Sequence, residues 1–221
     1  MKYIVVDLEM NPIAKTHADR AAICKNEIIE IGAVVLDENF QEISSFMTYV
    51  KPEYNSEIVK KIEKLTGINW QMVENAPSFA EAFEMFSAYC RSIKGEYEIC
   101  EWSDSDRVQF EKEIELKNYV LDPFEEELMG RFVDFQKEFG DELGLERQVS
   151  LKNALYYIGI DFKGRAHDAL FDARNTAELL TVARVEERRK VVMDKIVEIL
   201  HPTELTSSLG DLIDFSSFQL A

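Results

Sequence analysis

The stretch KYIVVDLE, residues 2–9, combines a β-branched apolar run with two carboxylates at its end. Such a run predicts a buried strand whose C-terminal end carries Asp7. Residues two apart in a strand point to the same face, so Asp7 and Glu9 are expected side by side. Neighbouring carboxylates repel each other, and a hard divalent cation such as Mg²⁺ removes that cost. The alternative is a strand end that reaches solvent.

Outward from this strand, the pattern alternates between strands and helices. Residues 27–36 predict a second strand, and residues 40–50 its hairpin partner across a turn at 37–39. Further strands are expected at 97–102 and 131–136, and helices after Ser56 up to Gly67, at 79–93, 106–118 and 151–158, and from His167 or Asp168 to about Leu200. This order predicts an α/β fold, with a mixed sheet of about five strands and helices on both faces.

Composition limits the classes of function. The 221 residues include 25 lysines and arginines against 42 aspartates and glutamates, a formal net charge of −17. That charge argues against a nucleic-acid coat protein, but not against an enzyme that contacts phosphates through bound metals. The cysteines, Cys24, Cys90 and Cys100, are too few and too scattered for a disulfide framework. Without a signal-peptide pattern or a membrane-length apolar run, we expect a cytoplasmic location and no membrane association.

A second acidic motif occurs in residues 164–180, GRAHDALFDARNTAELL. Asp172 lies in an apolar helical stretch, where a carboxylate is costly unless it is paired or liganded. His167 is a candidate base, because histidine exchanges protons near neutral pH. The alternative is that Asp168 caps the helix and His167 is a surface histidine.

A third segment, EWSDSDRVQFEKE at residues 101–113, starts a helix directly after a strand. Either Asp104 or Asp106 is expected to cap that helix, which leaves the other free to face a site.

Together these segments resemble the DEDDh 3′→5′ exonuclease superfamily, and within it the branch of ERI-1-type RNA exonucleases and bacterial KapD-type proteins. The similarity covers roughly residues 1–185 and keeps the order of the motifs. The segments that carry it are VVDLEMNP (5–12), EIIEIGAVVLD (27–37), LTGI (65–68), APSFAEAFEMF (76–86), EWSDSDRVQFEKE (101–113) and SLKNALYYIGIDFKGRAHDALFDARNTAELL (150–180).

The resemblance implies an RNase H-like exonuclease domain at residues 1–185. For residues 186–221 the residue pattern itself predicts a C-terminal helix extension and a docked apolar tail. The resemblance also implies two divalent ions, Mg²⁺ or Mn²⁺, and a histidine base that takes the proton of the attacking water. The matching residues are the metal ligands Asp7, Glu9, Asp106 and Asp172 and the base His167, with Asp104 as the runner-up to Asp106.

The implied activity is hydrolysis of RNA or single-stranded DNA from the 3′ end, with release of nucleoside 5′-monophosphates. Leu8 and Met10 are candidates to pack on the terminal nucleotide, and equally candidates for the core. The alternative function is a non-catalytic nucleic-acid or protein binding module that retains the fold. In that case the apolar segment 205–220 is a candidate for self-association or for holding a partner. The presence of all five motif residues favours the enzyme.

Local cations are the remaining candidates for phosphate contact in so acidic a chain. They are Lys15, Arg20, Arg107, Lys163 and Arg165, each of which is also expected as a solvated surface charge. For the basic residues of the run 184–190, the preferred interpretation is a solvated helix face, and phosphate binding is the alternative. The overall charge favours short or exposed 3′ ends over long duplexes.

Overall fold

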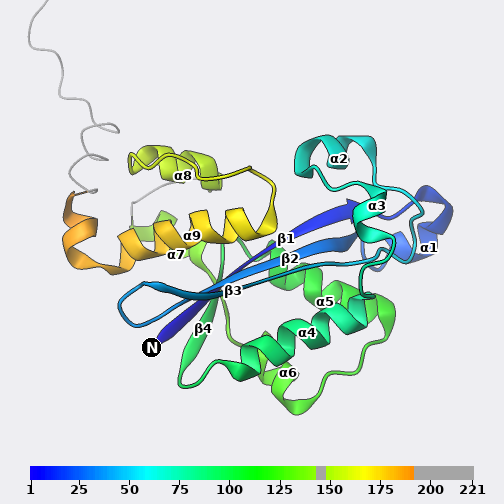
Figure 1. The fold of residues 1–221 in the computed structure, drawn as a ribbon, viewed down its shortest axis with the longest axis horizontal. Coiled ribbons are helices and arrows are strands. Elements are labelled where there is room, and N and C mark those ends of the chain that lie inside the picture. Colours follow the sequence, from blue (N-terminus) through cyan, green and yellow to red (C-terminus); the bar gives the residue numbers. More distant parts are fainter. Residues whose placement is uncertain (143–147, 192–221) are drawn as a thin grey trace, which may run out of the picture.

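A five-stranded sheet forms the centre of the computed structural model, which describes residues 1–142 and 148–191 (Figure 1). In space the strands follow the order β3-β2-β1-β4-β5. They are β1 (Lys2–Pro12), β2 (Asn26–Leu36), β3 (Glu42–Tyr49), β4 (Tyr97–Glu101) and β5 (Phe132–Asp134). The first three strands pair antiparallel, whereas β4 and β5 run parallel to β1. The predicted mixed sheet is confirmed.

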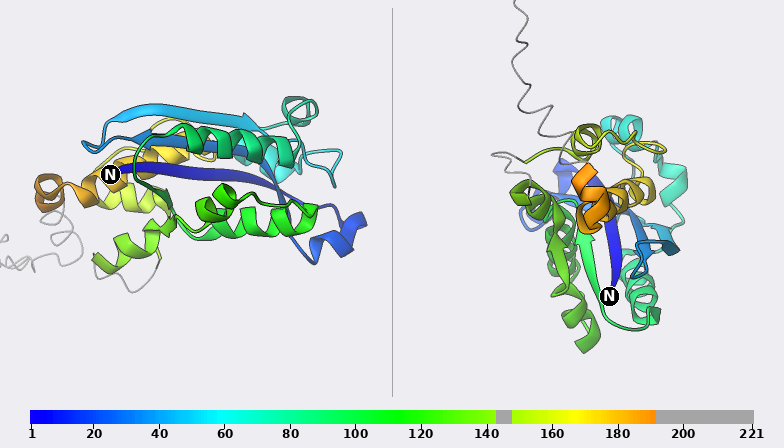
Figure 2. Two further views of the ribbon diagram at one scale, coloured as in Figure 1. Left: turned by 90° about the horizontal axis from the view of Figure 1, so that it is seen from below. Right: turned by 90° about the vertical axis from the view of Figure 1, so that its left-hand side faces the viewer.

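Helices cover both faces of this sheet, as the two turned views show (Figure 2). One face carries α7 (Phe135–Glu142), α8 (Leu151–Tyr157) and α9 (Ala169–Arg184). The other carries α4 (Phe79–Ser92), α5 (Ser105–Lys117) and α6 (Pro123–Met129). Four short helices lie beyond the ends of the strands: η1 (Lys15–His17), α1 (Ala18–Ala21), α2 (Lys60–Thr66) and α3 (Trp70–Val73).

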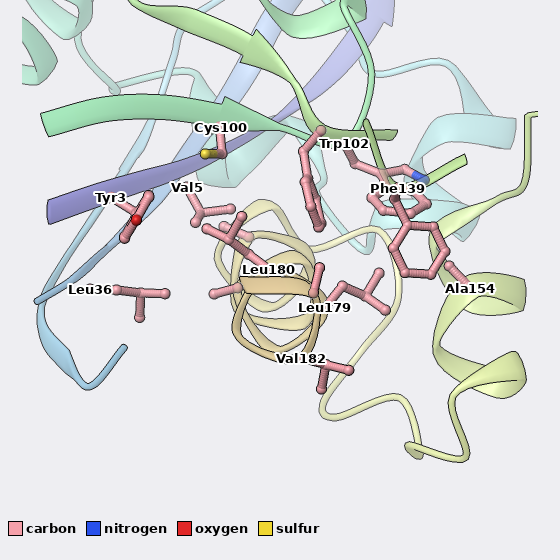
Figure 3. Packing of buried hydrophobic residues seen from close by; sticks show 14 of the residues in the cluster. Tyr3, Val5, Leu36, Cys100, Trp102, Phe139, Ala154, Leu179, Leu180 and Val182 are labelled. Atoms are coloured by element: carbon pink, nitrogen blue, oxygen red, sulfur yellow. The ribbon is translucent and has the colours of Figure 1, made fainter. Parts of the chain in front are cut away.

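Strand β1 is buried on both faces because its alternating side chains enter two separate cores. Tyr3 and Val5 pack against α9 (Figure 3). Ile4 and Val6 pack against α4 and α5 on the other side. Asp7 and Glu9 continue the row of Tyr3 and Val5, and therefore lie on the α9 face. This confirms that the two acids share one face.

Side-chain caps define several helix starts. Ser78 forms a capping box with Glu81 at the start of α4. Ser150 caps α8, and Asp168 caps α9 by accepting a hydrogen bond from the backbone N–H of Phe171 at 3.1 Å. The helix starts expected at these three caps are confirmed, and so is the alternative in which Asp168 serves as the helix cap.

The expected helix start at Ser56 is wrong, because α2 begins only at Lys60. The buried side chain of Asn11 accepts a hydrogen bond from the N–H of Val59 and donates one to the carbonyl of Glu57. These bonds tie the segment to β1 in a non-helical conformation. At residues 131–136 the strand is shorter than predicted, because a helix begins directly after Asp134.

The expectation of one helix from 168 to about 200 is also wrong. Helix α9 ends at Arg184, and Val185 is extended, with φ −94° and ψ 109°. The guanidinium of Arg184, at this end of the helix, pairs with Glu98 on β4 and Glu138 on α7. The predicted tail and the segment 205–220 lie outside the described residues. Within the described part, no helix combines the length and the apolar character needed to cross a bilayer.

Candidate active site

Three elements bring acidic side chains to one edge of the sheet. Strands β1 and β4 are parallel, so their C-terminal ends meet at the same edge. Asp7 comes from β1, Asp106 from the first turn of α5 just after β4, and Asp172 from the first turn of α9. Asp106 and Asp172 are the strongest charged neighbours of Asp7, followed by Glu9. The four predicted carboxylates therefore lie near enough to raise one another's pKa values.

His167 joins this group through its ring. A ring nitrogen of His167 and carboxylate oxygens of Glu9 and Asp172 all lie within 4.8 Å of one another. Asp172 Oδ2 also accepts a hydrogen bond from the backbone N–H of His167 at 3.1 Å. Its other oxygen, Oδ1, is buried and has no hydrogen-bond partner. A buried carboxylate oxygen without a partner is costly, and a bound cation would satisfy it.

The electrostatics of the cluster favour the binding of protons or cations. Burial, and then the charges of Asp172 and Glu30, raises the pKa of Glu9 to about 8. Burial likewise raises the pKa of Asp172 to about 6. The pKa values of Asp7 and Asp106 lie well above the usual range, because both groups are removed from water beside other carboxylates.

The structure distinguishes the two acids at the start of α5. Asp106 is only 5% exposed, receives a hydrogen bond from the backbone of Leu8 and faces Glu9 and Asp172. Asp104 is exposed at the N-cap position and makes no side-chain cap bond. The acid that joins the cluster is therefore Asp106, in agreement with the assignment made from the resemblance.

The turn that carries His167 is strained. His167 has φ 62°, in the left-handed region that side chains with a Cβ rarely adopt. Gly164, three residues earlier, has φ 78° and lies so close to the Phe171 ring that a Cβ has no room. Strained backbone of this kind is concentrated at functional sites. The turn presents an exposed imidazole to the buried acids.

Two further acids of the cluster were missed from the sequence. Glu30 on β2 lies opposite Glu9 in the strand ladder, and burial raises its pKa to about 7. Glu101 ends β4, accepts a hydrogen bond from the N–H of Arg107 at 2.7 Å, and has a pKa raised by burial to about 7. A carboxylate inside an otherwise apolar strand was the available signal for both.

Leu8 and Met10 lie on the face opposite the acids. Leu8 is buried in the core formed with α4, α5 and α6, and Met10 packs against the same core. Their placement fits the core interpretation, and their contact with a substrate stays a prediction.

Most of the candidate cations are engaged by neighbours. Lys163 pairs with Glu178, Arg107 with Glu111, and Arg20 with Asp19. The Arg165 guanidinium lies against Gly67 at the end of α2. Lys15 lines a cavity beyond the end of β1.

Comparison with known proteins identifies the family. The sequence profile of the exonuclease family RNase_T matches residues 4–180. The 3′-5′ exoribonuclease 1 of Rattus norvegicus is 26% identical over 196 residues, which cover 85% of this chain and 54% of that protein. The ERI1 exoribonuclease 2 of Xenopus laevis is 29% identical over 183 residues, which cover 69% of this chain and 25% of that protein. The chain thus spans about half the length of the first relative, and less of the second.

Solved structures support the fold. The nuclease domain of 3′hExo, described as a DEDDh family member bound to rAMP, superposes with a TM-score of 0.70 at 23% identity, covering 81% of this chain and 90% of that domain. E. coli exonuclease I in complex with a dT13 oligonucleotide superposes with a TM-score of 0.62 at 15% identity. The superposition covers 86% of this chain and 42% of exonuclease I. The predicted RNase H-like exonuclease fold is confirmed. The profile match over residues 4–180 shows that this chain belongs to the RNase_T exonuclease family.

Proposed function

We propose that the chain is a metal-dependent 3′→5′ exonuclease that releases nucleoside 5′-monophosphates from RNA or single-stranded DNA. The observation that carries this proposal is the grouping of Glu9, Asp172 and His167 within 4.8 Å, with one buried oxygen of Asp172 unpartnered and with Asp7 and Asp106 near enough for the Asp172 charge to raise their pKa values. The names of the relatives point in the same direction. They include exoribonucleases and a PolC-type DNA polymerase III of Thermotoga maritima, which is 28% identical over 88% of this chain and 13% of that protein.

The donor set fits a hard divalent cation. All four acids offer only oxygen ligands, which Mg²⁺ and Mn²⁺ prefer, and their raised pKa values are the expected cost of crowding them without a cation. We assign Asp7, Glu9, Asp106 and Asp172 as the residues that would hold two such ions. When bound, divalent ions supply the positive charge that neutralises phosphate oxygens and acidifies water.

The residues of the chain account for the remaining steps. His167 accepts a proton from the attacking water at a ring nitrogen. The water oxygen forms a bond to phosphorus while the bond from phosphorus to the 3′ oxygen of the preceding nucleotide breaks. That 3′ oxygen takes up a proton, and the terminal nucleotide leaves with the phosphate on its 5′ carbon. Asp172, bonded to the backbone of His167, keeps the imidazole beside the acids.

The test uses 5′-labelled RNA and DNA oligonucleotides with Mg²⁺, Mn²⁺ or EDTA. We expect stepwise shortening from the 3′ end, with nucleoside 5′-monophosphate as product, and none in EDTA. Asp7→Asn should lower the rate at least about 100-fold, since it removes a ligand for the charge that stabilises the transition state.

Asp141→Asn is the matched control, because Asp141 is an exposed acid on α7 that pairs with Lys137. It should retain full activity. Undiminished hydrolysis by Asp7→Asn would refute the proposed mechanism. Binding of oligonucleotides without hydrolysis under any metal condition would instead favour the non-catalytic binding module.

We also propose a cytoplasmic location, which is supported by the three cysteines, all buried and free. Self-association through residues 205–220 stays a prediction, because these residues lie outside the described structure.

A further inference from the structure

Glu30 is a buried carboxylate that the proposed mechanism does not use. It lies in the middle of β2, is 2% exposed, and faces Glu9 across the strand ladder. Its Oε2 accepts a hydrogen bond from the backbone N–H of Ala169 at 3.1 Å. That N–H belongs to the first turn of α9, where backbone donors have no partner within the helix. Glu30 therefore supplies a partner that the helix itself does not supply.

A second contact fixes the same turn. Gly32 lies two residues further along β2 and on the same face. A Cβ at Gly32 would come within 2.3 Å of the Ala169 carbonyl carbon and 2.4 Å of the Leu170 nitrogen. The backbone of α9 therefore lies directly on the backbone of β2 at this point. The hydrogen bond to Glu30 and the close approach at Gly32 fix the distance of the first turn of α9 from β2 and its rotation about the helix axis.

The fixed turn lies between the two residues that matter for the site. Ala169 follows His167 by two positions and precedes Asp172 by three. Moving Ala169 relative to β2 would move the imidazole and the Asp172 carboxylate relative to Glu9, since Glu9 lies on the adjacent strand. We propose that Glu30 is a positioning residue, whose hydrogen bond to Ala169 holds His167 and Asp172 against Glu9. This inference rests on the proposed function.

The role of Glu30 as an acceptor is distinguishable from a role as a metal ligand. Glu30→Gln keeps an oxygen that accepts the Ala169 N–H, whereas Glu30→Leu keeps the volume and removes the acceptor. Glu113→Gln is the matched control, because Glu113 is also buried and also accepts a backbone N–H of β2, from Ile28 at 2.8 Å.

The first measurement is independent of catalysis. Amide hydrogen exchange is followed by NMR in the metal-free protein, and we expect the Ala169 N–H to exchange at least about 10-fold faster in Glu30→Leu. Glu30→Gln and Glu113→Gln should leave its protection close to that of the parent protein. Unchanged protection of Ala169 in Glu30→Leu would overturn the inference, whatever the activity.

The second measurement is kinetic, on a short labelled oligonucleotide. For Glu30→Leu we expect kcat to fall about 10- to 100-fold with little change in KM, since a small displacement of reacting groups lowers the chemical step. Glu30→Gln should remain within about threefold of the parent. If Glu30→Gln instead loses activity and Mn²⁺ affinity as severely as Glu30→Leu, Glu30 is a ligand and the positioning role is wrong. If the parent hydrolyses no substrate while Ala169 still loses protection, only the proposed function fails.

Discussion

The left-handed backbone conformation of His167 lowers the stability of the folded protein. A residue with a Cβ loses about 1–2 kcal/mol in this conformation, whereas glycine adopts it freely. Asn118, at the C-terminal end of α5, also has a positive φ, of 51°. Asparagine and histidine occur in this region more often than other residues with a Cβ, but neither adopts it as freely as glycine. Glycine at position 167 would therefore relieve the backbone strain, but it would also remove the imidazole.

Replacing His167 is therefore expected to affect stability and activity separately. His167→Gly should be about 1 kcal/mol more stable than His167→Ala, because only alanine retains the Cβ strain. Both should lower kcat about 10²- to 10⁴-fold, the range attributed to a general base. Urea unfolding and single-turnover hydrolysis measure the two effects. Equal stability of the two variants would contradict the strain, and near-parent activity of both would remove His167 from the reaction.

At the scale of elements, the contact between β2 and α9 decides the geometry of the site. Strand β2 is buried along nearly all of its length, and α9 crosses it at contact distance where β2 has a glycine. The C-terminal half of α9 packs through Leu179 and Leu180 into the core shown in Figure 3. The N-terminal half, which carries Asp172, is in addition held by backbone contact with β2.

Gly32→Ala is therefore expected to destabilise the fold by about 1–3 kcal/mol, because the new Cβ meets backbone atoms that cannot rotate away. Hydrolysis should fall as well, since α9 has to shift. Gly140→Ala is the control. Gly140 lies within α7, a Cβ there meets no atom of the described residues within 4 Å, and alanine should stabilise by about 0.5–1 kcal/mol. Denaturant unfolding of both variants checks the signs. A neutral Gly32→Ala would show that the close approach is not required.

At the scale of the whole molecule, buried carboxylates link stability to pH. Burial is the first cause of the raised pKa values of Glu9, Glu30, Glu101, Glu113 and Asp172, which lie between about 6 and about 8. In the unfolded chain these groups titrate near 4 to 4.5. Between the two ranges the folded protein binds more protons than the unfolded chain, so its free energy of unfolding decreases as the pH rises.

We therefore expect the metal-free protein to lose stability progressively from about pH 5 to about pH 8. Mg²⁺ or Mn²⁺ should restore stability most at the upper end, where the ligands are ionised. Urea unfolding at several pH values, in EDTA and with each metal, measures this. Glu113→Gln should flatten the slope equally with and without metal, because Glu113 lies apart from the cluster, whereas Asp7→Asn should reduce the metal effect. A metal effect that is absent at pH 8 would contradict the proposed site.

The elements of the fold and most of the acidic cluster follow from local patterns. Strand periodicity places Asp7 and Glu9 on one face, and caps such as Ser78 and Asp168 start helices, because these effects involve only residues close in sequence. The helix start predicted after Ser56 is wrong because the conformation there depends on Asn11, a partner far along the chain.

The sequence by itself predicted the family motifs, the mixed sheet and four of the site residues, namely Asp7, Glu9, Asp172 and His167. Only the tertiary structure decided that Asp106 rather than Asp104 joins them, that Glu30 lies beside Glu9, and that His167 occupies a strained turn. Each of these depends on which strands and helices become neighbours. Burial and charge proximity are properties of that packing, and they are not encoded in the spacing of residues along the chain.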